Sequence, residues 1–197
     1  MKLYYTPKSH FSRKVLILIN AWGIDIQLID VGNVATSSMD TFGGNPLMKV
    51  PTLVEDKLWI IDSDHIAQYL VRKYDLQDSF AVLTTDIHTL NARAILNGIM
   101  SAEVEILLAR RTGIDTNLYP RFDKIIETIS TGLDWLEHNV AVFATSPTYL
   151  CFHLACMWDH LSLYKTVDLN YPNLQEQVEK LSLLPYVAAN TPKLDTI

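Results

Sequence analysis

The sequence predicts two domains of different class, a mixed α/β domain followed by a bundle of helices. Three observations predict this arrangement. A strand, a helix and a second strand succeed one another within roughly the first thirty residues, the usual length of a βαβ unit. Two short apolar runs then flank Asp56-Lys57 at the spacing of a β-hairpin. Beyond residue 86, apolar side chains recur every three or four positions, as they do in packed helices.

The first three elements are predicted from local residue types. Lys2–Tyr5 is rich in β-prone residues and stops at Thr6–Ser9, which contains proline and is interpreted as a loop. A helix is expected over Phe11–Trp22, where apolar residues recur at helical spacing until Gly23 supplies a stop signal. Ile26–Val31 is the second strand, and it should run parallel to the first because a crossover helix returns the chain to the same edge.

The rest of the first domain is predicted to be a hairpin and a helix. A long loop, Gly32–Pro46, leads to the two hairpin strands, Thr52–Glu55 and Leu58–Ile61. Ser63 can then cap a helix whose apolar residues line one face. We therefore expect a βαβ-ββα domain over residues 1–75.

The second domain is predicted to be all-α. Residues 76–85 have no clear period and are interpreted as a linker. Four helices are expected after it, near residues 87–110, 118–139, 148–164 and 173–183. The clearest apolar series lies in the second of them, at Ile125, Ile126, Ile129, Leu133 and Leu136. A helical bundle over residues 86–197 follows from this pattern.

Charge and length exclude several kinds of partner. The chain has 16 Lys and Arg against 22 Asp and Glu, a formal net charge of -6 at pH 7, so it lacks the basic surface that nucleic-acid-binding proteins use. No apolar stretch approaches the ~20 residues that span a bilayer. We expect no nucleic-acid partner, no membrane partner and a cytoplasmic location. Cys151 and Cys156 lie in an expected helix where their side chains diverge, so no disulfide is expected.

The first candidate site residue is Ser9, at the junction of a strand and a helix. A hydroxyl at this position lies beside unpaired backbone N–H groups and the positive end of the helix dipole, so it can help to hold an anion. The alternative is that Ser9 only caps the helix, which is the commoner role of such a serine. Its neighbour His10 is by default a surface histidine.

The second candidate is the loop that precedes the hairpin. Proline cannot donate to a strand ladder, so Pro51 belongs at the first position of its strand, and a turn of this kind often contains a cis bond. A cis Val50–Pro51 bond would turn the N–H and C=O of Val50 outward and offer a peptide-like ligand the pairing of an edge strand. The alternative is an ordinary trans entrance to the strand.

The third candidate is Asp62-Ser63-Asp64, at the start of the helix that follows the hairpin. A hydroxyl, free N–H groups and a carboxylate converge there. The N–H groups suit the carboxylate of an amino-acid head group, and Asp suits its ammonium. The alternative is an N-cap with acidic residues in the first turn, which is equally good helix chemistry.

In this order and spacing the three segments resemble the glutathione S-transferase family. The segment from Lys2 to Val15 is similar to the bacterial-type pattern Tyr-x-x-x-x-Ser-Pro-Phe-x-Arg-Lys-Val, with His10 where proline is usual. Asn45 to Leu53 is similar to Asn-Pro-x-Gly-Lys-Val-Pro-x-Leu, with Met48 in the glycine position. Asp62 to Leu70 is similar to Glu-Ser-x-x-Ile-x-x-Tyr-Leu.

One departure from the family concerns a helix start in the second domain. The family has a Thr-x-x-Asp capping box there, whereas this chain reads Thr148-Tyr149-Leu150-Cys151. A thiol is a poor acceptor for the reciprocal hydrogen bond of the box. We expect that helix start to be weaker by ~1 kcal/mol.

The resemblance implies a thioredoxin-like first domain, glutathione as co-substrate and conjugation of its thiolate to a small hydrophobic electrophile. It places Ser9 as the catalytic residue that faces the sulfur. The glutathione-binding residues that it implies are Lys49, Val50, Pro51, Asp62 and Ser63. The electrophile pocket is expected between the Ser9 loop and the first long helix of the second domain, with His10, Met100 and Val104 as lining residues. The family also implies a homodimer.

Three other functions are alternatives to conjugation. A glutathione-binding relative with little or no catalysis, in a structural or interaction role, is favoured by His10 and Met48 at motif positions. A glutathione-dependent isomerase would usually carry a Ser-Ser-Cys run where this chain has Ser9-His10-Phe11. Thiol-transferase chemistry needs a cysteine near position 9 or 10, and the first cysteine is Cys151. The histidines show no metal-ligand spacing, so no metal is expected.

Overall fold

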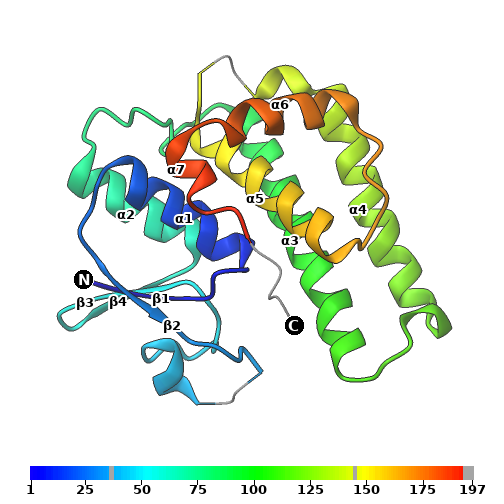
Figure 1. Ribbon diagram of the computed structural model, residues 1–197, viewed down its shortest axis with the longest axis horizontal. Coiled ribbons are helices and arrows are strands. Elements are labelled where there is room, and N and C mark those ends of the chain that lie inside the picture. The colour runs from blue at the N-terminus through cyan, green and yellow to red at the C-terminus, as the bar shows by residue number, and fades with distance from the viewer. Residues whose placement is uncertain (36–37, 144–145, 193–197) are drawn as a thin grey trace. The chain divides into compact units, whose positions relative to one another are not determined.

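The computed structural model describes residues 1–35, 38–143 and 146–192 (Figure 1). The chain divides into two compact units. The first comprises residues 1–83 together with the segment that begins at Pro185, and the second comprises residues 84–184. This division differs from the expected domain boundaries at the C-terminal end of the chain. The reason is local packing: Arg13 Nε donates to the carbonyl oxygen of Asn190, and the rings of Phe80 and Tyr186 lie 6.1 Å apart.

The first unit contains a four-stranded sheet. Its strands are β1 (Lys2–Tyr5), β2 (Gln27–Asp30), β3 (Thr52–Glu55) and β4 (Leu58–Ile61), in the order β2-β1-β3-β4. The β1–β2 pair is parallel, and the β1–β3 and β3–β4 pairs are antiparallel. The expected βαβ-ββα order and the thioredoxin-like sheet are therefore confirmed.

Two helices of equal length, α1 (His10–Ala21) and α2 (Ser63–Tyr74), lie side by side on one face of this sheet (Figure 1). Their apolar faces and the inward side chains of the central strands form one core: Leu3, Val15, Leu16, Ile19, Leu53, Ile66 and Leu70. The loop before the hairpin contains a short 3-10 helix, η1 (Met39–Phe42), which was not expected. The short helix α7 (Pro185–Ala188) packs against α1.

The second unit is helical, as predicted. It contains α3 (Ile87–Arg111), α4 (Pro120–His138), α5 (Tyr149–Tyr164) and α6 (Pro172–Ser182), with the 3-10 helices η2 (Thr116–Leu118) and η3 (Val140–Val142). Helix α3 packs against α4 and α5, and α5 packs against α6. Helix α5 is apolar on nearly all sides because it is buried along most of its length. In the described ranges no helix is long and apolar enough to cross a membrane.

The start of α5 retains half of a capping box. The Thr148 side chain accepts a hydrogen bond from the N–H of Cys151 at 3.4 Å, and the Cys151 thiol lies 3.3 Å from the same hydroxyl. The threonine therefore caps the helix without an acidic partner. The expectation of a weaker helix start stays a prediction.

A polar cluster joins α2 to the hairpin. Glu55 on β3 accepts hydrogen bonds from the Tyr69 hydroxyl and the Lys73 ammonium of α2. The Lys73 ammonium also lies 5.8 Å from the centre of the Tyr69 ring. The hydrogen bonds from Lys73 and Tyr69 lower the pKa of Glu55 below its ordinary 4.5.

This lowered pKa predicts how stability depends on pH. Because folding lowers the pKa of Glu55, the folded chain binds protons there less readily than the unfolded chain does. The stabilisation by this cluster is therefore complete above pH 4.5 and is lost as the pH falls through the lowered pKa. We expect Glu55→Gln to lower the urea midpoint at neutral pH. The two midpoints should converge under strongly acidic conditions, and a constant difference at all pH values would contradict this.

Candidate functional site

The three predicted site segments lie at one end of the sheet. Tyr4 of β1 pairs with Thr52 of β3, and Thr52 pairs with Ile61 of β4. The residues just after β1, just before β3 and just after β4 therefore share one edge, and these are the segments that contain Ser9, Val50 and Asp62. Strand pairing thus gathers side chains that are far apart in the sequence.

Ser9 caps α1. Its hydroxyl oxygen accepts a hydrogen bond from the N–H of Ser12 at 3.2 Å, and its carbonyl oxygen accepts from the N–H of Arg13 at 2.9 Å. The side chain is half-buried. Capping uses the oxygen as an acceptor and leaves the hydroxyl hydrogen as a donor. Capping and donation to an anion are therefore compatible roles for this serine. From the sequence alone they were alternatives.

Val50 lies just outside the strand ladder. The expected cis bond between Val50 and Pro51 is present. Pro51 is buried and Val50 is half-buried. Within residues 1–35, 38–143 and 146–192, neither the N–H nor the C=O of Val50 makes a hydrogen bond. This peptide unit is available to an extended ligand.

The loop around Val50 is braced by Asn45. The Asn45 side chain is buried, and its amide donates to the Lys49 carbonyl oxygen at 2.9 Å and to the Thr52 hydroxyl at 3.1 Å. The Thr52 hydroxyl also donates to the Lys49 carbonyl oxygen. Met48 has φ +49°, in the left-handed region that glycine adopts without cost. Methionine therefore occupies a position where the backbone favours glycine, at a cost of about 1 kcal/mol.

Asp62 is the N-cap of α2. Its carboxylate accepts hydrogen bonds from the N–H groups of Asp64 at 2.8 Å and His65 at 3.2 Å. The expectation that Ser63 caps this helix is wrong. Ser63 is the first helical residue and is buried, because the aspartate before it has taken the capping position. Asp62 has φ +74°, a strained conformation of the kind that clusters at functional sites.

The other predicted site residues lie in different surroundings. The expectation that His10 is a surface residue is wrong: only 1% of it is exposed, and its ring packs edge-on against Phe11. Lys49 is exposed. Met100 is fully buried and Val104 is half-buried, both on α3 of the second unit. Their place in an electrophile pocket stays a prediction.

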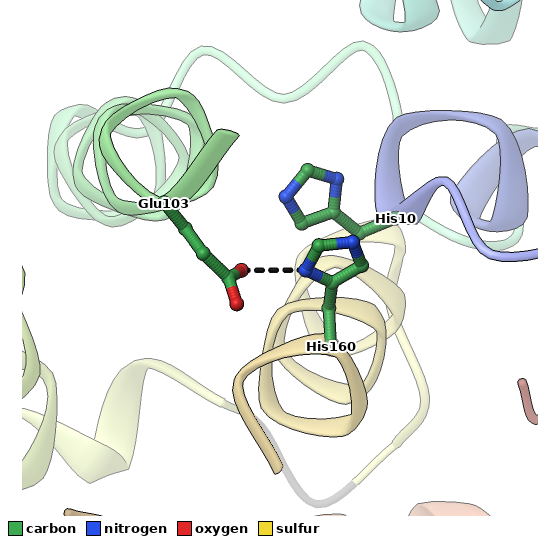
Figure 2. A group of neighbouring side chains, drawn as sticks. All are labelled: His10, Glu103 and His160. Carbon is green, nitrogen blue, oxygen red and sulfur yellow. Dashed lines mark hydrogen bonds and ion pairs between the residues drawn. The ribbon is translucent and has the colours of Figure 1, made fainter. Parts of the chain in front are cut away.

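A buried polar cluster in the second unit was not predicted from the sequence. Figure 2 shows His160 of α5 beside Glu103 of α3, and the imidazole Nδ1 lies 2.6 Å from a carboxylate oxygen of Glu103. The Thr166 hydroxyl donates to the other oxygen at 3.0 Å. Glu103 is fully buried and His160 is nearly so. The signal for this cluster was a glutamate in the apolar stripe of α3, three residues from Met100 and from Ile106.

A buried ion pair in the first unit was also not predicted from the sequence. The Lys14 ammonium of α1 lies 2.8 Å from an Asp64 oxygen of α2, and the Lys14 side chain is fully buried. Lys14 stands three residues after Phe11 and next to Val15, on the apolar face of the predicted helix. A lysine in that stripe was the signal.

Two hollows in the second unit contain none of the predicted site residues. One, of about 340 Å³, is lined by α3 and α4 residues that include Ile99 and Gly132. The other, of about 450 Å³, is lined by residues that include His88 and His138. Asp86 in the second hollow caps α3, and hydrogen bonds from the N–H and hydroxyl of Thr89 lower its pKa. Its ionised carboxylate is therefore already hydrogen-bonded to the first turn of α3.

The end of the sheet brings together three groups that suit a peptide-like anionic ligand. It offers a hydroxyl donor at the positive end of a helix, a peptide unit with open hydrogen-bonding groups and a carboxylate at a second helix start. Such a hydroxyl and helix end can stabilise an anion, and a thiolate is one of the anions that they suit.

Comparison with known proteins agrees with this arrangement. Residues 3–78 match the family model described as the N-terminal domain of glutathione S-transferase. The chain is similar in fold to a glutathione S-transferase from Methylobacterium radiotolerans in complex with glutathione sulfonate. The two share 21% identity with a TM-score of 0.83, over 100% of this chain and 96% of that one.

Two further solved structures are similar in fold. One is a glutathione transferase family member from Pseudomonas fluorescens with bound S-(propanoic acid)-glutathione, at 22% identity and a TM-score of 0.83, over 98% of this chain and 99% of that one. The other is a bacterial maleyl pyruvate isomerase, a glutathione S-transferase of the zeta class. It shares 20% identity with a TM-score of 0.74, over 100% of both chains. The chain therefore has the fold of glutathione S-transferases.

Proposed function

We propose that this protein is a glutathione S-transferase that conjugates the glutathione thiolate to small hydrophobic electrophiles. The observation that carries the proposal is the half-buried Ser9 hydroxyl, which caps α1 at the sheet edge that also presents the open peptide unit of Val50. The match of residues 3–78 to the N-terminal domain family supports glutathione as the ligand at that edge.

Each part of glutathione has a proposed anchor in the first unit. The main-chain N–H and C=O of Val50 pair with the cysteinyl residue of glutathione. Asp62 and Ser63 bind the γ-glutamyl head group, and the exposed Lys49 binds a carboxylate. Ser9 donates to the sulfur. The protein acts as a cytoplasmic homodimer, as the family resemblance suggests.

The interaction energies available at this site are large enough to lower the pKa of the glutathione thiol so that the thiolate is populated at neutral pH. A free thiol has a pKa of about 8.5, and lowering it by two units requires about 2.7 kcal/mol in favour of the thiolate. One hydroxyl donor to a charged group supplies ~1.5 to 3 kcal/mol, and the helix dipole supplies ~0.3 to 1 kcal/mol. Ser9 and the start of α1 are together sufficient.

A second candidate is a glutathione-binding protein without significant catalysis. Met48 with its strained backbone and the buried His10 both stand at motif positions that this chain has changed. Either substitution can alter the loop that faces the sulfur while leaving the tripeptide anchors intact.

The test combines binding with turnover. We expect isothermal titration calorimetry to detect glutathione binding, and the protein to accelerate the reaction of glutathione with an aryl halide above the uncatalysed rate. Binding with a background rate would favour the second candidate. If the protein neither binds glutathione nor accelerates the reaction, both functions are contradicted.

A further inference from the structure

A buried ion pair joins the two helices whose first turns bear the proposed anchors. The Lys14 ammonium lies 2.8 Å from Asp64 Oδ1, with Lys14 fully buried and 18% of the Asp64 side chain exposed. Lys14 also lies 5.6 Å from the centre of the Phe11 ring. An ion pair between a buried ammonium and a carboxylate is directional, so it helps to hold the two helices together.

The pair lies close to both anchor points. Ser9 caps α1 and Lys14 follows one turn later, while Asp62 caps α2 and Asp64 is the second residue of that helix. The pair therefore constrains how the helix that Ser9 caps lies against the helix that Asp62 caps. Helices α1 and α2 pack on each other, but apolar packing alone permits sliding that a directional ion pair resists.

Glutathione has to reach both anchors at once. Its γ-glutamyl group and its cysteinyl sulfur are joined by a fixed number of bonds, so only one range of spacing between Asp62 and Ser9 satisfies both. Misplacement by about 1 Å is enough to lose much of an oriented interaction.

We propose that Lys14 and Asp64 are positioning residues, which set the spacing between Asp62 and Ser9 and so select a ligand with both a γ-glutamyl group and a cysteinyl thiol. This inference rests on the proposed function. It differs from a purely structural role because it concerns the thiol end of the ligand in particular. Loss of the pair should weaken the contact between sulfur and Ser9 more than the contacts of the γ-glutamyl group.

The test compares how tightly two tripeptides bind to the wild-type protein and to the variant Asp64→Asn. Asparagine keeps the shape of the side chain and removes its charge. The dissociation constants of glutathione and of γ-glutamyl-alanyl-glycine, which lacks the thiol, are measured by calorimetry on wild type and variant. We expect the preference for glutathione over the thiol-free tripeptide to fall by about tenfold in the variant. The thiol of bound glutathione should also titrate about one pH unit higher.

The matched control is Glu55→Gln. It removes the carboxylate of a second Lys–carboxylate pair, which joins Glu55 of β3 to Lys73 in the last turn of α2, at the opposite end of that helix from Asp62. We expect this variant to keep the wild-type preference and the wild-type titration of the thiol.

Each outcome decides between the roles. A preference that stays at the wild-type value in folded Asp64→Asn would overturn the inference, because a purely structural defect weakens both tripeptides by the same factor. If Asp64→Asn does not fold, the double variant Lys14→Met/Asp64→Leu replaces the ion pair by an apolar contact, which is often tolerated. The same loss of preference is expected there, and an unchanged preference overturns the inference. Wild type that binds neither tripeptide contradicts the proposed function itself.

Discussion

Replacing Ser9 with alanine is expected to lower kcat/KM for glutathione conjugation by about 10- to 100-fold. The hydroxyl is the proposed donor to the thiolate, and a hydrogen bond to a charged group contributes ~1.5 to 3 kcal/mol. The thiol pKa of bound glutathione should rise in the same variant. Steady-state kinetics with an aryl halide and titration of thiolate absorbance measure the two effects.

Two control substitutions separate catalysis from capping. The Ser9 oxygen also accepts from the N–H of Ser12, so alanine costs about 1 kcal/mol of helix stability in addition. Ser9→Thr keeps both the donor and the cap and should retain most of the activity. Ser9→Gly nearly keeps the cap and lacks the donor, so it should be as impaired as alanine. If kcat/KM is unchanged in both Ser9→Gly and Ser9→Ala, Ser9 has no catalytic role.

Replacing Glu103 with alanine is expected to lower the free energy of unfolding by about 3 to 5 kcal/mol. Glu103 is fully buried and accepts hydrogen bonds from both His160 and Thr166. Its removal takes away the acceptor of the Thr166 hydroxyl and the carboxylate partner of His160, so these hydrogen bonds no longer offset the cost of burying the groups. Urea denaturation followed by circular dichroism gives the measurement.

Glu105 provides the matched control on the same helix. It pairs with Arg121 on the surface, where 42% of the glutamate side chain is exposed. Solvent screens such a pair, so Glu105→Ala should cost less than about 1 kcal/mol. Equal effects of the two substitutions would show that the buried cluster does not stabilise the helical unit.

Local sequence patterns were sufficient to predict the strands and the longer helices of both units, but not the 3-10 helices η1, η2 and η3 or the short helix α7. The expected strands and helices agree with the observed ones to within about two residues. Ser9, Val50 and Asp62 could be named as candidates because each is defined by its immediate neighbours: a strand end, a proline or a helix start. Strand register then brings them together.

The two buried polar pairs could not be predicted in the same way. Lys14 and Asp64 are 50 residues apart, and Glu103 and His160 are 57 residues apart. A charged residue in an apolar stripe signals that some partner exists, but which one depends on how the helices pack. The burial of His10 and the capping of α2 by Asp62 also depend on side-chain placement that periodicity does not specify.

The most direct test of the account is a pH titration of thiolate ultraviolet absorbance with glutathione bound to the wild-type protein. The account predicts a midpoint about two pH units below that of free glutathione, because the Ser9 hydroxyl and the start of α1 favour the charged sulfur. A midpoint equal to that of free glutathione, at protein concentrations that saturate binding, would contradict it.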